Sequence, residues 1–157
     1  MNKLKKIFQN FAIAGVLVSA PLYPSIVDSP KDLSNWYEKS FTYQREALNE
    51  DGSRQDIWKT PKETVDDRGG DCEDFAILSK KILKELGYEA WMLAMYDETN
   101  VGHAVCLFRE IDGTYSIMDV RHYVPFKRKD FNTIFKTNYK EYDHFSICTE
   151  DELCDEI

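Results

Sequence analysis

Apolar residues recur at helical spacing near the middle of the chain. Between residues 71 and 86 they step by three or four positions, and the apolar ones are Phe75, Ala76, Leu78, Ile82, Leu83 and Leu86. This period predicts an amphipathic helix over 71–86. Gly87 follows it, at a place where glycine commonly ends a helix. We expect one face of this helix to pack on the core.

Start signals predict two shorter helices upstream. A serine and a proline at 29–30 are typical of a helix N-terminus, and the segment 31–40 that follows carries an apolar stripe. Thr60 and Glu63 have the spacing of a capping box, with a proline between them at the first helical position. We expect this second helix to end near residue 67.

Further along the chain, the period of the apolar residues shortens towards two. Three segments have the alternation of strands, and they are 89–96, 102–109 and 115–120. Asp112 and Gly113 indicate a hairpin between the last two. A short helix is expected over 129–136 and a final strand over 143–148. Helices followed by an antiparallel sheet make an α+β fold.

Composition and charge limit what the chain can be. A chain of 157 residues with 43% apolar and 13% aromatic residues is expected to form one domain with a packed core. We place this domain at 29–150 and an acidic tail at 151–157. A net charge of −8 disfavours binding through phosphate groups, so nucleic acid is not an expected partner.

The first 27 residues differ in kind from the rest. Lys3, Lys5 and Lys6 precede an uncharged stretch over 7–27, which is the layout of a secretory signal. Segment 1–27 is therefore predicted to be a signal peptide or an uncleaved membrane anchor, because the stretch is just long enough to span a bilayer. Export to the periplasm or envelope is expected, with membrane contact only for the uncleaved form.

Four cysteines are too few for a disulfide-dense scaffold. Core packing must therefore hold this fold. Cys148 and Cys154 are close in sequence and could pair in an exported protein, and the sequence leaves this open.

Cys72, His103 and Asp119 form a set with catalytic potential. Cys72 falls in the first turn of the predicted helix, where unpaired N–H groups and the helix dipole favour a thiolate. His103 and Asp119 lie on neighbouring predicted strands, and an inward aspartate needs a partner. The two residues share a face only if the hairpin loop has an odd length, so we predict three or five residues centred on Asp112. Cys72, His103 and Asp119 together provide a nucleophile, a base and an orienting acid.

Four motifs carry a family resemblance, at 58–63, 68–76, 102–105 and 118–119, including Gly-Asp-Cys-Glu-Asp-Phe-Ala around the cysteine. Together they resemble the bacterial transglutaminase-like cysteine proteinases and their transglutaminase-core relatives. The resemblance implies a papain-like fold, with the nucleophile at the start of a helix packed on an antiparallel sheet. It implies Cys72 as nucleophile, His103 as base and Asp119 as orienter of the imidazole.

The resemblance also implies a donor upstream of the nucleophile to complete an oxyanion site, for which Tyr43, Gln44 and Trp58 are candidates. The expected reaction is cleavage of a peptide or amide bond in a protein or peptide substrate, through a Cys72 thioester. Two alternatives stay open: acyl transfer from glutamine to an amine on the same triad, and a binding module that has kept the fold without activity.

Acidic residues surround the predicted nucleophile and by themselves raise the pKa of a thiol. No cofactor is required by the expected chemistry. Some exported members of the resembled group bind calcium through the acids on either side of the cysteine, which are Asp71 and Glu73 here. The resemblance therefore makes calcium a possible ligand, although nothing in the sequence has the alternating acids of a calcium loop.

Overall fold

The computed structural model describes residues 21–47, 50, 57–99 and 102–148, together with the backbone of 154–156. In these segments the elements are α1 (Pro30–Ser40), β1 (Thr42–Tyr43), α2 (Pro61–Asp67), β2 (Gly69–Gly70), α3 (Cys72–Glu85), β3 (Glu89–Tyr96), β4 (Gly102–Arg109), β5 (Tyr115–Asp119), β6 (His122–Arg128), α4 (Phe131–Asn138), β7 (His144–Cys148) and β8 (Cys154–Glu156). The predicted α+β class is confirmed.

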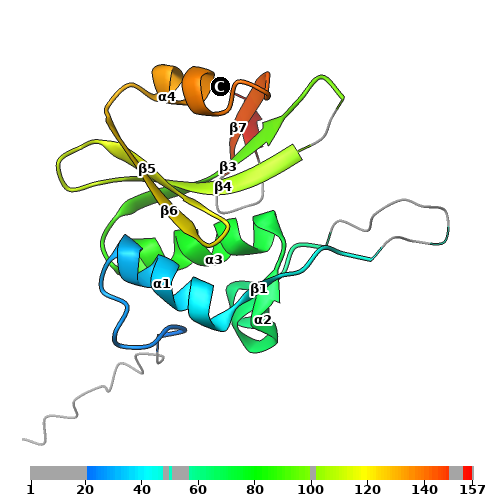
Figure 1. Cartoon of the computed structure of the whole chain (residues 1–157), viewed down its shortest axis with the longest axis vertical. Helices are drawn as coiled ribbons and strands as arrows, with labels where there is room; N and C mark the ends of the chain where they lie inside the picture. The colour runs from blue at the N-terminus through cyan, green and yellow to red at the C-terminus, as the bar shows by residue number, and fades with distance from the viewer. Residues whose placement is uncertain (1–20, 48–49, 51–56, 100–101, 149–153, 157) are drawn as a thin grey trace, which may run out of the picture.

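An antiparallel sheet in the order β6-β5-β4-β3-β7-β8 lies at the centre of the molecule. Helices α1 and α3 cover one face of it, and α4 covers the other (Figure 1). Strands β1 and β2 form a separate parallel pair beside the start of α3. The sheet therefore has two buried faces with different helices on them.

Side-chain caps are present at the start of the first three helices, and the sequence predicted those of α1 and α2. Ser29 accepts a hydrogen bond from the Asp32 N–H at the start of α1, and Thr60 and Glu63 form a capping box at the start of α2. Asp71 and Asp74 form another at the start of α3. Each box satisfies backbone N–H groups that a helix start leaves unpaired. Local sequence thus determines where these helices begin.

Alternation along the strands separates the core into two parts. Even-numbered residues of β3 and β4, such as Ala90 and Phe108, pack with Phe75 of α3. Odd-numbered residues, such as Leu93, pack with Phe135 of α4. Successive side chains of a strand point to opposite faces, so the register decides which residues meet which helix.

The hairpin between β4 and β5 has the predicted odd-length loop. Cys106 lies opposite Met118 and Arg109 lies opposite Tyr115, which leaves residues 110–114 as a loop centred on Asp112. This register places Asp119 on the same face of the sheet as His103. The prediction from the pairing parity is confirmed.

Strand β6 was not predicted. A short helix was expected to begin at residue 129, but α4 begins only at Phe131, and residues 122–128 form strand β6. Strand β6 contains Pro125, and Lys127 has a left-handed backbone with φ 54°. The register between β5 and β6 shifts near this point. A proline and a bulge hide the alternation that identifies a strand.

The described part of the N-terminal segment packs against the domain. Val27 is only 2% exposed and Tyr23 contacts the same core cluster. The signal or anchor predicted for 1–27 lies mostly outside the described residues, and its boundaries stay predictions. Within the described residues, no helix has the length and apolar character needed to cross a membrane.

The cysteines divide into free thiols and a disulfide. Cys72 and Cys106 are free and buried, whereas Cys148 is disulfide-bonded. The backbone of Cys148 pairs with that of Cys154 across β7 and β8.

Candidate active site

The start of α3 and the β1–β2 pair position Cys72. Strand β2 immediately precedes the helix, and Gly70 lies so close to Asp74 that an added Cβ would approach the Asp74 Cβ to 2.5 Å. Asp74 in turn accepts a hydrogen bond of 2.7 Å from the Lys59 N–H. The chain can make this close approach only because glycine has no side chain. Cys72 follows as the first residue of α3 and is 8% exposed.

The Cys72 thiol donates a hydrogen bond of 2.9 Å to Oε2 of Glu73. Burial raises the pKa of Cys72 to about 12, and the hydrogen bond and charge of Glu73 and the charge of Asp71 add to the rise. The backbone N–H of Ala104 opposes the shift. In this arrangement the thiol is protonated at neutral pH.

His103 and Asp119 meet on the face of the sheet that α4 covers. His103 Nε2 lies 2.8 Å from Asp119 Oδ1, and the Tyr139 hydroxyl donates a bond of 3.0 Å to Asp119 Oδ2. Burial alone would raise the pKa of Asp119, but the hydrogen bond and charge of His103, then Tyr139 and His122, outweigh it. The net shift is downward, so the carboxylate stays charged and can hold a charged imidazole.

Tyr142 lies beside His103. Its ring stacks on the imidazole with centroids 6.4 Å apart and an angle of 21° between the planes. Burial raises the pKa of Tyr142, and the charges of Glu141, Cys72 and Asp119 add to that rise. With Nε2 bonded to Asp119, Nδ1 is the ring nitrogen left for proton exchange.

The structure thus brings His103 and Asp119 into direct contact and places Cys72 close by. Ala104, whose N–H faces the Cys72 sulfur, is the residue after His103 and packs with Cys72 in one small apolar cluster. The thiol and the imidazole lie on either side of the first residues of β4. The thiol donates its hydrogen bond to Glu73 and not to the imidazole.

The three oxyanion candidates lie near the start of α3 but differ in their contacts. Tyr43 is 41% exposed, and its pKa is raised by burial and then by the charge of Cys72. Trp58 packs against the cluster that contains Cys72. The Gln44 side-chain amide donates a 3.2 Å hydrogen bond to Thr42 Oγ1. Trp58 packs on the cluster of Cys72 and the charge of Cys72 acts on Tyr43, and the role of oxyanion donor stays a prediction for all three.

Two tyrosines of this site were missed by sequence reasoning. Tyr139 and Tyr142 lie in the turn between α4 and β7, a segment without a strand or helix pattern. Only the packing of α4 over the sheet brings them to His103. Arg121 donates to the Phe41 carbonyl, and Tyr123 donates to Glu110, so both have partners outside this site.

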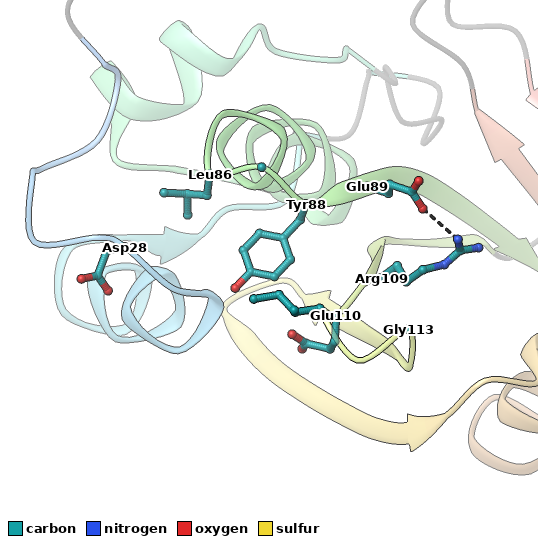
Figure 2. Close-up of a pocket in the computed structure, with 9 residues that line it drawn as sticks. Asp28, Leu86, Tyr88, Glu89, Arg109, Glu110 and Gly113 are labelled. Atoms are coloured by element: carbon teal, nitrogen blue, oxygen red, sulfur yellow. Dashed lines mark ion pairs between the residues drawn. The ribbon is translucent and has the colours of Figure 1, made fainter.

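A groove of about 450 Å³ lies at the other end of α3 and is not part of this site (Figure 2). Its lining includes Tyr88, Glu110 and the ion pair between Glu89 and Arg109, whose N–O distance is 3.0 Å. These residues follow the C-terminus of α3, whereas Cys72 is at its N-terminus. The groove is therefore remote from the thiol.

Comparison with known proteins places the fold in a family. The family model for the transglutaminase-like domain matches residues 22–148. A UPF0252 protein from Archaeoglobus fulgidus is 35% identical over 69 residues, which cover 43% of this chain and 21% of that protein.

Solved structures of LapG from Legionella pneumophila are also similar. One form has a TM-score of 0.50 at 22% identity over 73% of this chain and 61% of LapG. An EGTA-treated form has a TM-score of 0.50 at 20% identity, covering 80% and 69%. A calcium-bound form has a TM-score of 0.48 at 22% identity, covering 73% and 63%. A candidate cysteine protease from Cytophaga hutchinsonii has a TM-score of 0.44 at 17% identity, covering 81% and 44%.

The chain thus spans about a fifth of the Archaeoglobus protein and 61% to 69% of LapG. At these identities the likeness to LapG shows a shared fold. The family match covers most of the chain. This protein belongs to the transglutaminase-like domain family.

Proposed function

We propose that the chain is a thiol enzyme that cleaves a peptide or amide bond, with Cys72 as nucleophile, His103 as base and Asp119 as orienting acid. The observation that carries this proposal is the hydrogen bond of 2.8 Å between His103 Nε2 and Asp119 Oδ1. Cys72 begins α3, and the N–H of Ala104, the residue after His103, acts on its thiol. An imidazole oriented by a carboxylate beside a thiol is the arrangement of activated-nucleophile catalysis.

The proposed reaction has two stages. His103 Nδ1 takes the Cys72 proton, and the sulfur attacks the carbonyl carbon of the substrate. The C–N bond then breaks, the leaving amine takes the proton from the imidazolium, and a thioester remains on Cys72. Water, deprotonated by His103, attacks the thioester and releases the acid, and Cys72 regains its proton. Asp119 holds the Nε2–H and stabilises the imidazolium in both stages.

The contact with Glu73 opposes the first stage, because it keeps the Cys72 thiol protonated and hydrogen-bonded. The thiol has to leave the Glu73 carboxylate, and burial and Glu73 hold the pKa of Cys72 at about 12. A positively charged imidazolium next to the sulfur would lower that pKa again. The same observation favours the rival function, a binding module in which the thiol stays protonated and idle.

The substrate class, a protein or a peptide, is part of the same proposal. The chemistry accepts an amide bond in a protein or peptide, and an amine in place of water would make the same thioester a step in acyl transfer. Export to the periplasm or envelope is proposed on the lysines and uncharged stretch of 1–27. In that proposal 29–150 is the exported catalytic domain and 151–157 its acidic tail.

Calcium is the metal that the acids beside Cys72 could take. Asp71 and Glu73 supply hard oxygen donors, and the charges of both carboxylates act on the Cys72 thiol. Calcium, however, takes six to eight oxygen ligands. No group of three or more His, Cys, Asp or Glu side chains gathers for a metal in the described segments. These two acids would therefore hold calcium only with backbone carbonyls or water. A bound cation would offset their charge near the sulfur.

Alkylation followed by mass spectrometry tests the proposed function. The full chain is treated with iodoacetamide at neutral pH, alongside the His103→Ala and Cys72→Ala variants. Cys106 is an internal control, because it is a free thiol whose pKa burial raises strongly. We expect fast modification at Cys72 that slows in His103→Ala. Equally slow modification of Cys72 and Cys106 in the wild-type chain would reject the enzyme and favour the binding module.

A further inference from the structure

Both oxygens of the Asp119 carboxylate are engaged, and by different elements. Oδ1 lies 2.8 Å from His103 Nε2 of β4, and Oδ2 accepts the Tyr139 hydroxyl at 3.0 Å from the turn after α4. A carboxylate held at one oxygen can rotate about its Cβ–Cγ bond. One held at both oxygens keeps its plane, and so keeps the direction in which it accepts the imidazole N–H.

Tyr139 is itself fixed in place. Its ring stacks on Phe135 of α4 with centroids 5.6 Å apart, and its N–H donates to the Phe135 carbonyl at 2.9 Å. The Tyr139 carbonyl accepts the Tyr142 N–H at 3.1 Å, so one turn carries both the ring that stacks on His103 and the hydroxyl that bonds Asp119. This turn therefore couples α4 to the pair of residues on β4 and β5.

The chemistry of a phenol suits this position. Burial, followed by the charge of Asp119, raises the pKa of Tyr139 well above its usual range, so the hydroxyl keeps its proton and donates throughout the physiological pH range. A cation at the same place would neutralise Asp119 and reduce its hold on a charged imidazole. A neutral donor orients the carboxylate and leaves its charge for His103.

We infer that Tyr139 is a positioning residue, which acts on His103 through Asp119 by holding the carboxylate at its second oxygen. The inference rests on the proposed function for its catalytic meaning. The Tyr139 hydroxyl bonds Asp119 and neither the sulfur nor the imidazole, so the effect of this hydroxyl on His103 passes through the carboxylate. The other titratable groups near Asp119 are His103, His122 and Tyr142, with Glu141 beside the tyrosines.

The test compares Tyr139→Phe with a matched control in the full chain. Tyr123→Phe removes a hydroxyl that also donates to a carboxylate, Glu110 Oε1 at 2.8 Å, away from His103. Carbon-13 NMR follows the titration of the Asp119 carboxyl, and nitrogen-15 NMR follows the ring N–H of His103. Iodoacetamide reports the reactivity of Cys72.

We expect the Asp119 titration to move to higher pH in Tyr139→Phe, because a hydrogen bond to the charged form is lost. The His103 N–H signal should weaken through faster exchange with water, and alkylation of Cys72 should slow about tenfold. Tyr123→Phe should match the wild-type chain in all three. An unchanged Asp119 titration and an unchanged His103 signal in Tyr139→Phe would overturn the inference.

A second replacement keeps the test decisive if the phenylalanine variant does not fold. 3-Fluorotyrosine at position 139 preserves the ring and makes the hydroxyl a stronger donor, so the Asp119 titration should move to lower pH. No movement, or movement upward, would count against the inference. If the NMR results agree with it but wild-type Cys72 reacts no faster than Cys106, the proposed function fails and the link between Tyr139 and Asp119 stands.

Discussion

Replacing Asp119 with asparagine tests the centre of the proposed site. Asparagine has nearly the same shape and can still accept the Tyr139 hydroxyl, but it has no charge to stabilise the imidazolium of His103. The His103 and Asp119 side chains are 21% and 28% exposed, so water screens the pair only in part. A hydrogen bond to a charged group contributes about 1.5–3 kcal/mol, and we take about 2 kcal/mol for this pair.

That free energy corresponds to a roughly thirtyfold loss in the rate of Cys72 alkylation, since about 1.4 kcal/mol is tenfold. The assay is the pseudo-first-order rate with iodoacetamide at neutral pH, measured together with urea unfolding. The free energy of unfolding should fall by only about 1 kcal/mol, because the shape and one hydrogen bond remain.

Asp112→Asn is the matched control for this prediction. Asp112 is an exposed carboxylate in the same hairpin and accepts hydrogen bonds of 2.9 and 2.7 Å from the N–H and hydroxyl of Thr114. Cys72 in the Asp112→Asn variant should be alkylated at the wild-type rate. If Asp119→Asn also reacts at the wild-type rate while staying folded, the reasoning is refuted, and Asp119 is a structural partner of His103.

Three further predictions follow from the surroundings of Cys72. Glu73→Gln should speed alkylation at neutral pH, because the charge that raises the pKa of Cys72 is removed; a slower rate would show that Glu73 assists the thiol. Gly70→Ala should lower the free energy of unfolding by about 1–3 kcal/mol, since the new Cβ would approach the Asp74 Cβ to 2.5 Å, and unchanged urea unfolding would contradict this. If Asp71 and Glu73 bind calcium, this ion should raise both the melting temperature and the alkylation rate over those in EGTA. Magnesium is the control, and the response should be lost in Glu73→Gln. Equal values with calcium and with EGTA would leave Asp71 and Glu73 as helix-start acids without a metal role.

Local signals predicted the parts of the fold that depend on neighbours in sequence. The period of α3 and the capping boxes at Thr60 and Asp71 involve residues within four positions of each other, so the sequence shows them directly. The register of β4 and β5 was also predictable, because parity alone decides whether His103 and Asp119 share a face. Strand β6 was missed because Pro125 and the left-handed Lys127 interrupt its pattern.

The parts of the site that were missed depend on distant contacts or on side-chain rotation. Tyr139 reaches Asp119 across 20 positions in sequence, and nothing near Tyr139 signals that partner. The direction of the Cys72 thiol depends on the rotation of its side chain, which here turns the thiol to the Glu73 carboxylate. Composition and spacing report which residues are present near the start of α3, but the conformation of the thiol is a property of the packed structure.

The odd length of the loop after Arg109 restricts how this hairpin can change in length. Adding or deleting a single residue in 110–114 would leave the new loop even and turn Asp119 to the α3 face, where Met118 now packs. A change of two residues would restore the face and alter only the exposed tip at Ile111. Length variants of this loop that retain the His103–Asp119 contact should therefore differ in steps of two.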